Sequence, residues 1–221
     1  SCRWCRKNLD NGCRSYTYIS TLGKLMEACI EFDKELVVLD RPNPLGGNKI
    51  EGCYVEQPFN SFVSQYRIPY VYGLTVGELA IMINEEGLNR GQKGDQDPVK
   101  CKLTVVPMEG WTRDMLYEDT GLPWVLPSPN IPFKESPIYY ASSGICGELY
   151  GFMNIGIGYT LPFQLFGALW LDPEKLKEKL ESGRDMAYLS YDLATIRTNA
   201  PIDFEPMDAV VRPYNKVELF K

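Results

Sequence analysis

The chain has 221 residues, of which 44% are hydrophobic, so it is long enough to bury the core of one large domain. Its formal net charge of −6, with scattered Lys and Arg, argues against a nucleic-acid backbone or an anionic membrane surface as the main partner. The absence of histidine excludes His-based triads and His-ligated metals. Catalysis would therefore fall to carboxylates, tyrosines, cysteines or lysines.

Seven cysteines are spread along the chain, and most are expected to be reduced and buried. Cys2 and Cys5 have the spacing of half a zinc site, but no second close pair completes it. We therefore expect no metal and no cofactor. No apolar run approaches the roughly 18 to 20 residues that span a bilayer, and the first 13 residues are too polar for a signal peptide.

The first half of the chain alternates helix and strand signals. Apolar residues at helical spacing predict a helix over residues 17–33, which leads into a buried strand at residues 36–39. A short strand is predicted at residues 68–72. Thr75 and Glu78 form a capping box for a helix over residues 76–86. A polar surface loop at residues 89–97 precedes a strand at residues 101–106, and this order favours a parallel βαβ unit.

The second half is richer in proline. Five prolines in residues 121–137 predict an extended segment that runs over the surface. Residues 138–141 predict a further strand, and Pro162 begins a helix that Thr160 can cap. The last predicted helix covers residues 174–181, and residues 187–221 are expected to form short strands and loops.

Three predicted strand ends deliver polar residues, and in a parallel sheet these ends share one edge, where ligands bind. Asp40, Arg41 and Asn43 follow one strand in a loop stiffened by two prolines, and Glu109 follows another. Arg41 suits a carboxylate or phosphate, and Asn43, like Asn130 further along the chain, suits sugar hydroxyls or amides.

Residues 142–148 follow the third of these predicted strands. Within them, Glu148 is a candidate carboxylate with a raised pKa for acid–base chemistry.

A structural interpretation fits the same residues. Asp40 and Arg41 can be a capping carboxylate and a surface cation at a strand end, and Glu148 can cap a turn. Tyrosines could stack on a sugar ring or could be core residues with satisfied hydroxyls; those concerned are Tyr16, Tyr18, Tyr139, Tyr140 and Tyr159. The residues alone leave both interpretations open.

Several motifs resemble the NamZ/YbbC-type exo-β-N-acetylmuramidases. They are SYTYISTL at residues 15–22, VLDRPNP at 38–44, GLTVGELA at 73–80, LTVVPMEGW at 103–111, the segment 122–132, which begins with LPW, and TLPF at 160–163. The resemblance extends in order over residues 12–180. It implies an α/β fold: a Rossmann-like parallel-sheet domain, incomplete at its N-terminus, over residues 1–183. A short C-terminal appendage, residues 184–221, would begin an auxiliary or capping region.

The same resemblance implies a function. Such proteins release N-acetylmuramic acid from the non-reducing ends of peptidoglycan fragments, and they are commonly exported by bacteria. The lactyl carboxylate of that sugar would explain a fixed Arg41, with Glu148 as the catalytic candidate in this chain. The implied substrate-binding residues are Asp40, Arg41, Asn43, Tyr16, Tyr18, Glu109, Ser128, Asn130, Tyr159 and Thr160.

The chain also departs from the family pattern. The Glu-His-Gly motif that carries the family's principal catalytic glutamate is absent, and residues 1–9 look unlike the expected strand. Ile155 and Ile157 stand where many members have Glu and Arg. Two functions therefore remain: a domain that acts on or binds N-acetylmuramic acid, and a truncated, inactive homologue that only binds the sugar. A nucleotide-binding protein is disfavoured, because Gly156-x-Gly158 lacks the third glycine of a dinucleotide fingerprint.

Overall fold

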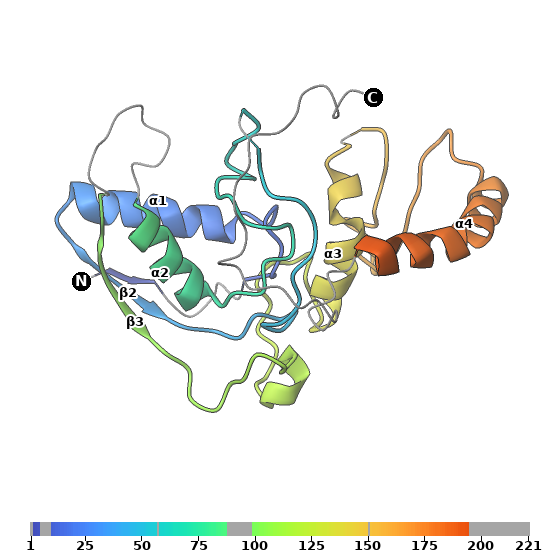
Figure 1. The fold of residues 1–221 in the computed structure, drawn as a ribbon. Coiled ribbons are helices and arrows are strands. Elements are labelled where there is room, and N and C mark those ends of the chain that lie inside the picture. The colour runs from blue at the N-terminus through green and yellow to red at the C-terminus, as the bar shows by residue number, and fades with distance from the viewer. Residues whose placement is uncertain (1, 5–9, 57, 88–98, 150, 195–221) are drawn as a thin grey trace, which may run out of the picture. The chain divides into compact units, whose positions relative to one another are not determined.

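The fold is built on a parallel three-stranded sheet (Figure 1), seen in a computed structural model that describes residues 2–4, 10–56, 58–87, 99–149 and 151–194. The strand order is β1 (Cys2–Trp4), β2 (Glu35–Leu39) and β3 (Lys102–Val106). Trp4 pairs with Val38, and Leu39 with Val106. The predicted α/β class with a parallel sheet is confirmed. Residues 1–9 look unlike the expected strand in sequence, yet Cys2–Trp4 within them form β1 by pairing along β2.

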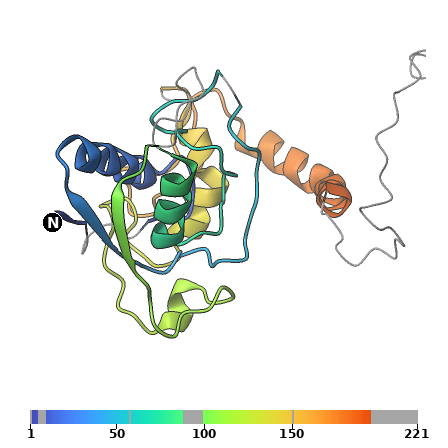
Figure 2. The ribbon, with the colours of Figure 1, turned by 60° about the vertical axis from the view of Figure 1, so that its left-hand side comes forward.

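Two helices cover this sheet. Helices α1 (Tyr18–Glu31) and α2 (Val76–Glu86) pack against each other and against β2, on the same side of the strands (Figures 1 and 2). Each helix buries one face, and the core that they form with the sheet includes Ile19, Leu22, Met26, Leu36, Val38, Leu79 and Ile83. Both predicted helices are confirmed, and β2, α2 and β3 make the parallel βαβ unit.

The strand predicted at residues 68–72 is not formed. Val71 makes only isolated antiparallel bridges to Cys13 and Glu51. Residues 99–101 lead into β3, whereas the predicted loop at residues 89–97 lies outside the described residues. The proline-rich segment is irregular over residues 121–134, as expected, after a short 3-10 turn at Tyr117–Thr120.

Two predictions in the second half are wrong. Residues 138–141 belong to helix α3 (Ser136–Gly147), which has Pro137 in its first turn, where a missing N–H costs nothing. No helix begins at Pro162: residues 151–172 contain neither helix nor strand. Instead, an antiparallel bridge joins Asn154 to Gly167, and the N–H of Phe163 donates to the carbonyl of Ile155 at 2.7 Å.

The chain divides into two compact units, Ser1–Leu169 and Trp170–Lys221. The second unit contains helix α4 (Pro173–Ala194), whose first N–H groups donate to Asp172, as the Asp-Pro pair indicates. Helix α4 is longer than the helix predicted over residues 174–181. The prediction of short strands and loops is therefore wrong for residues 187–194. The predicted domain boundary after residue 183 falls within α4 and stays a prediction. In the described part of the chain, none of the helices is both long enough and apolar enough to cross a membrane.

Candidate functional site

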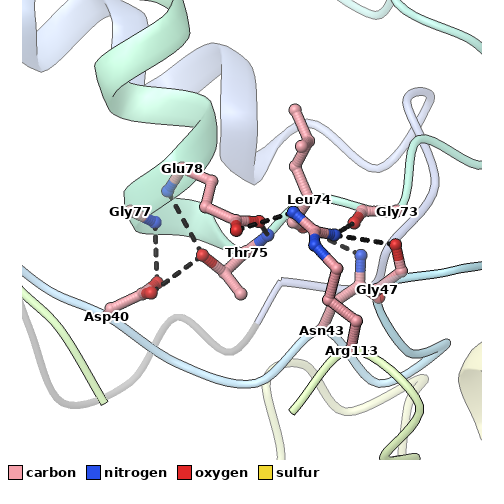
Figure 3. A network of polar contacts seen from close by, with 9 residues as sticks. All are labelled: Asp40, Asn43, Gly47, Gly73, Leu74, Thr75, Gly77, Glu78 and Arg113. Carbon is pink, nitrogen blue, oxygen red and sulfur yellow. Dashed lines mark hydrogen bonds and ion pairs between the residues drawn. The ribbon is translucent and has the colours of Figure 1, made fainter. Parts of the chain in front are cut away.

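Asp40 joins the end of β2 to the beginning of α2 (Figure 3). One carboxylate oxygen accepts the Thr75 hydroxyl at 2.8 Å, and the other accepts the backbone N–H of Gly77 at 2.7 Å. A carboxylate is favourable at this position because it meets the unpaired N–H groups and the positive end of the helix dipole. Asp40 therefore anchors the helix, and the predicted role in substrate binding stays a prediction.

The first turn of α2 is closed by the capping box predicted from Thr75 and Glu78. The Thr75 hydroxyl accepts the N–H of Glu78 at 3.2 Å, and the Glu78 carboxylate accepts the N–H of Thr75 at 3.0 Å. Gly77 allows Asp40 to approach, because a β-carbon there would lie 2.7 Å from the Asp40 Cγ.

Asn43 fixes the proline-rich loop after β2. Its side chain is 2% exposed; the amide donates to the carbonyl of Leu74 at 2.9 Å and accepts the N–H of Leu45 at 2.9 Å. Both amide atoms are thus occupied within the protein. Asn43 therefore ties the loop to the residue before the N-cap of α2, and its assignment to substrate binding stays untested.

Arg113 completes this polar network (Figure 3). Its guanidinium donates to the carbonyls of Gly47 and Gly73 at 2.8 and 2.9 Å, and forms an ion pair with Glu78 at 2.7 Å. It therefore ties the segment after β3 to the loop after β2 and to α2. The sequence offered no signal for this role, because Arg113 lies seven residues beyond the strand end.

Arg41 lies in the same loop, and its backbone N–H donates to Asp40 at 2.9 Å, but its guanidinium is not part of the network. Its side chain is exposed, and among the described residues its guanidinium makes no ion pair. The positive charge acts on Tyr117: burial raises the pKa of the Tyr117 hydroxyl, and Arg41 partly offsets this rise. Tyr117 in turn packs edge-to-face on Trp124, with ring centroids 4.7 Å apart. The exposed Arg41 guanidinium therefore has its charge available to an anion, within electrostatic reach of Tyr117.

Four of the predicted sugar-binding residues meet in a hydroxyl cluster, defined here as Tyr16, Tyr18, Ser128 and Asn130. The Ser128 hydroxyl lowers the pKa of the Tyr16 hydroxyl and the Tyr18 hydroxyl raises it, so these three hydroxyls lie near one another. Tyr18 donates to the carbonyl of Pro127 at 2.5 Å, and the N–H of Asn130 donates to Ser128 at 3.1 Å. Burial raises the pKa of Tyr16 to about 12, so this hydroxyl keeps its proton.

The Tyr16 ring packs against a second buried hydrophobic cluster, which includes Tyr70, Tyr140 and Phe163. Tyr16 packs edge-to-face on Tyr18 and on Tyr140, with 5.1 Å between centroids in each pair, and Tyr140 packs on Phe163 at 5.0 Å. The hydroxyls of Tyr140 and Ser15 are 2.9 Å apart. The interpretation of Tyr140 as a core residue is confirmed, and stacking of the tyrosines on a sugar ring stays a prediction.

Glu148 directly follows α3 instead of a strand, and its side chain is exposed. Its charge contributes to the raised pKa values of Tyr70 and Tyr140, for which burial is the main cause; the pKa of Tyr70 is raised to about 12. The burial on which the candidate acid–base role of Glu148 rested is absent, and that role stays a prediction.

Asp10 and Asn11 were not predicted as site residues. Asp10 is 4% exposed and Asn11 is fully buried, yet one carboxylate oxygen of Asp10 and both amide atoms of Asn11 have no hydrogen-bond partner among the described residues. Burial raises the pKa of Asp10 to about 7, partly offset by the N–H groups of Asn11 and Gly12. The Asp-Asn-Gly tripeptide was visible in the sequence, but its burial was not.

Three further predicted residues lie apart from this arrangement. Glu109, Tyr159 and Thr160 are exposed, and among the described residues no hydrogen bond or ring contact joins them to the hydroxyl cluster. Their assignment to substrate binding stays untested. Within the described ranges, no group of three or more acidic or cysteine side chains could hold a metal ion. Cys5 of the predicted half-site lies outside those ranges.

Comparisons with known proteins identify the family of this chain. The family model for the N-terminal part of exo-β-N-acetylmuramidase NamZ matches residues 9–135, and the model for its C-terminal part matches residues 138–210. The peptidoglycan β-N-acetylmuramidase NamZ of Bacillus subtilis is 43% identical over 173 residues, which are 78% of this chain and 39% of that protein.

Two solved structures are also similar. A DUF1343 family protein from Bacteroides fragilis shares 54% identity with a TM-score of 0.70, over 80% of this chain and 44% of that one. A second DUF1343 protein of that organism shares 36% identity with a TM-score of 0.59, over 72% and 41%. The chain spans less than half the length of each of these relatives. It belongs to the exo-β-N-acetylmuramidase NamZ family of peptidoglycan-acting glycoside hydrolases.

Proposed function

We propose that this chain binds the N-acetylmuramic acid unit at the non-reducing end of peptidoglycan fragments. The observation that carries the proposal is Arg41, whose guanidinium has no ion pair among the described residues and stands on a loop held by Asn43 and Arg113. N-acetylmuramic acid differs from N-acetylglucosamine by a lactyl group with a carboxylate. A guanidinium matches the geometry of a carboxylate with two parallel hydrogen bonds.

The hydroxyl cluster supports recognition of the sugar itself. Sugar hydroxyls both donate and accept hydrogen bonds, and the tyrosine and serine hydroxyls have the same capacity. Arg41 acts electrostatically on Tyr117, whose ring packs on Trp124, and Trp124 lies four residues before Ser128 in the chain. We therefore place the carboxylate at Arg41 and the ring toward the hydroxyl cluster.

Hydrolysis is a second candidate function, and Asp10 favours it. Glycosidases use two carboxyl groups, one of which donates a proton to the leaving oxygen. A carboxyl group with a pKa of about 7 is partly protonated near neutral pH, as a general acid must be. In this scheme Asp10 supplies the proton, and Glu148 remains the candidate for the second carboxylate.

Two measurements on the purified 221-residue chain test these functions. Calorimetric titration should show tighter binding of N-acetylmuramic acid than of N-acetylglucosamine; equal affinities would count against the binding proposal. A chromogenic β-N-acetylmuramide then tests hydrolysis. If colour is released, Asp10→Asn and Glu148→Gln identify which carboxyl takes part, and no release leaves binding as the function of this chain.

A further inference from the structure

A cavity of about 680 Å³ lies in the irregular segment that follows α3. Its described lining runs from Gly147, the last residue of α3, through residues 151–155 and 157 to residues 167–169. All of these residues belong to the first compact unit, Ser1–Leu169. None of them belongs to the hydroxyl cluster or to the loop that carries Arg41, so the cavity shares no described residue with the proposed sugar site.

Hydrogen bonds and packing hold the lining in place. Asn154 and Gly167 exchange two backbone hydrogen bonds, at 2.7 and 2.8 Å, which join two sides of the cavity. Ile155 is 2% exposed and belongs to the second buried hydrophobic cluster, and its carbonyl accepts the N–H of Phe163 at 2.7 Å. A β-carbon on Gly147 would lie 2.5 Å from Ile155 Cδ1, so the end of α3 packs against this residue. The cavity is therefore pre-formed, as most small-molecule sites are.

The lining is apolar and carries no charge among the described residues. Its larger apolar side chains are those of Phe152, Met153, Ile155, Ile157 and Leu169. Asn154 is the one polar side chain in this part of the lining, and its Oδ1 accepts the N–H of Gly156 at 2.7 Å. That bond orients the amide and leaves its NH2 group able to donate to a ligand. A charged ligand would find no compensating charge here.

We propose that this cavity binds a small, uncharged and mainly apolar molecule. Its volume of about 680 Å³ lies within the range of ligand pockets, roughly 300–1,000 Å³. The apolar side chains would contact most of the ligand, and the Asn154 amide would meet a single acceptor atom. Phe152 and Met153 favour an aromatic ligand, because aromatic edges and methionine sulfur both make favourable contacts with rings.

The alternative occupant is another protein, since exposed apolar surface often marks an interface. Phe152, Ile157 and Leu169 are exposed and line the cavity. A protein would have to insert a bulky side chain to fill this volume, whereas a small molecule can enter and be surrounded by the lining. The volume therefore favours the small molecule, and the oligomeric state of the chain separates the two.

The dye prodan, an uncharged naphthalene with one ketone oxygen, tests the proposal on the full chain. Fluorescence titration should show saturable binding of one molecule per chain. The anionic dye anilinonaphthalene sulfonate has a similar ring system, and it should bind at least roughly tenfold more weakly, because its charge meets no partner in the lining. Absence of saturable prodan binding, or equally tight binding of the anionic dye, would overturn the proposal.

A filled cavity gives the first variant. Gly167 lines the cavity, and a β-carbon there would meet no atom within 4 Å, so Gly167→Trp is tolerated and can occupy the volume. It should weaken prodan binding roughly tenfold or more. Gly183→Trp is the matched control, because Gly183 is equally open but lies in α4, away from the lining. The control should bind prodan as the unmodified chain does; equal affinities in both variants would place the dye elsewhere and refute the site.

A charge in the lining gives a second, independent variant. Ile157 is 50% exposed, so Ile157→Asp should fold and should weaken prodan binding. Ile81→Asp is its control, because Ile81 is 48% exposed in α2 and does not line the cavity. Light scattering is measured at the same concentrations. A dimer that Ile157→Asp converts to a monomer would make this face an interface between copies and would contradict the proposal, as would full prodan affinity in Ile157→Asp.

Discussion

A β-carbon on Gly12 would lie 2.4 Å from the Oδ1 atom of Asn43, so the turn after β1 packs directly against the loop after β2. That oxygen is already used, because it accepts the N–H of Leu45. Gly12 also has a φ of +78°, which residues with a side chain rarely adopt. Gly12 thus contacts the loop that carries Arg41, and the buried Asp10 lies two residues before Gly12 in the chain.

Gly12→Ala should therefore destabilise the fold through both strain and steric overlap. We expect the free energy of unfolding to fall by about 3 kcal/mol in urea titrations. Gly110→Ala is the matched control, because Gly110 has a φ of +76° with no atom near its missing β-carbon. That control should cost only about 1 kcal/mol, the backbone strain alone. Equal losses in the two variants would show that the contact with Asn43 is unimportant.

Asp40→Ala should destabilise the fold because it leaves the Thr75 hydroxyl and the Gly77 N–H without their acceptor. We expect a loss of about 2–3 kcal/mol in the free energy of unfolding, since hydrogen bonds to a charged group are the stronger ones. Glu27→Ala breaks only an exposed pair with Lys24 and serves as the control. It should leave stability almost unchanged. A loss no larger than that of the control would contradict an anchoring role for Asp40.

Asp10 should make stability depend on pH. Its folded-state pKa of about 7 lies above the unfolded value of about 4, so the folded chain holds this proton more tightly. The destabilising contribution is therefore absent at low pH, grows as pH rises through this interval, and is complete above pH 7.

The Asp10→Asn variant isolates this effect, because an amide of nearly the same shape does not ionise. Its stability relative to the unmodified chain should increase by about 2–3 kcal/mol between pH 5 and pH 8. Urea titrations at the two pH values measure it. A difference that is the same at both pH values would mean that Asp10 is not desolvated.

Gly23 of α1 faces the buried hydroxyl of Tyr66, and a β-carbon there would lie 1.6 Å from that oxygen. Gly23→Ala alone should destabilise the chain despite the better helix propensity of Ala. In the part of the chain that the structure describes, the Tyr66 hydroxyl has no hydrogen-bond partner, so Tyr66→Phe alone should be neutral or stabilising. In the Tyr66→Phe background, Gly23→Ala should lower the free energy of unfolding much less than it does alone. Simple additivity of the two changes would argue against the contact.

The first half of the fold was largely predictable because its signals are local. The apolar spacing of α1 and the Thr75–Glu78 capping box of α2 are both readable without tertiary information. The run Leu36–Leu39 ends in polar residues, which marked the strand end correctly. β1 was missed because Cys-Arg-Trp carries no strand pattern of its own and gains its conformation by pairing along β2.

The errors in the second half have a common origin in tertiary packing. Aromatic and β-branched residues at 138–141 indicate a strand, but Pro137 in the first turn and packing of Tyr140 against Tyr16 make the segment helical. Phe163 takes a φ of 65°, which no helix-start pattern anticipates. The hydroxyl cluster also needed the fold, because residues more than 100 positions apart supply it.

The most direct test of the account compares two sugars on one variant. The ratio of the dissociation constants of N-acetylglucosamine and N-acetylmuramic acid is measured by calorimetry for the unmodified chain and for Arg41→Ala. We predict that Arg41→Ala weakens N-acetylmuramic acid binding roughly 10- to 100-fold, as loss of a charge-assisted pair implies, with little effect on N-acetylglucosamine. An equal loss for both sugars, or none for either, would contradict the assignment of Arg41 to the lactyl carboxylate.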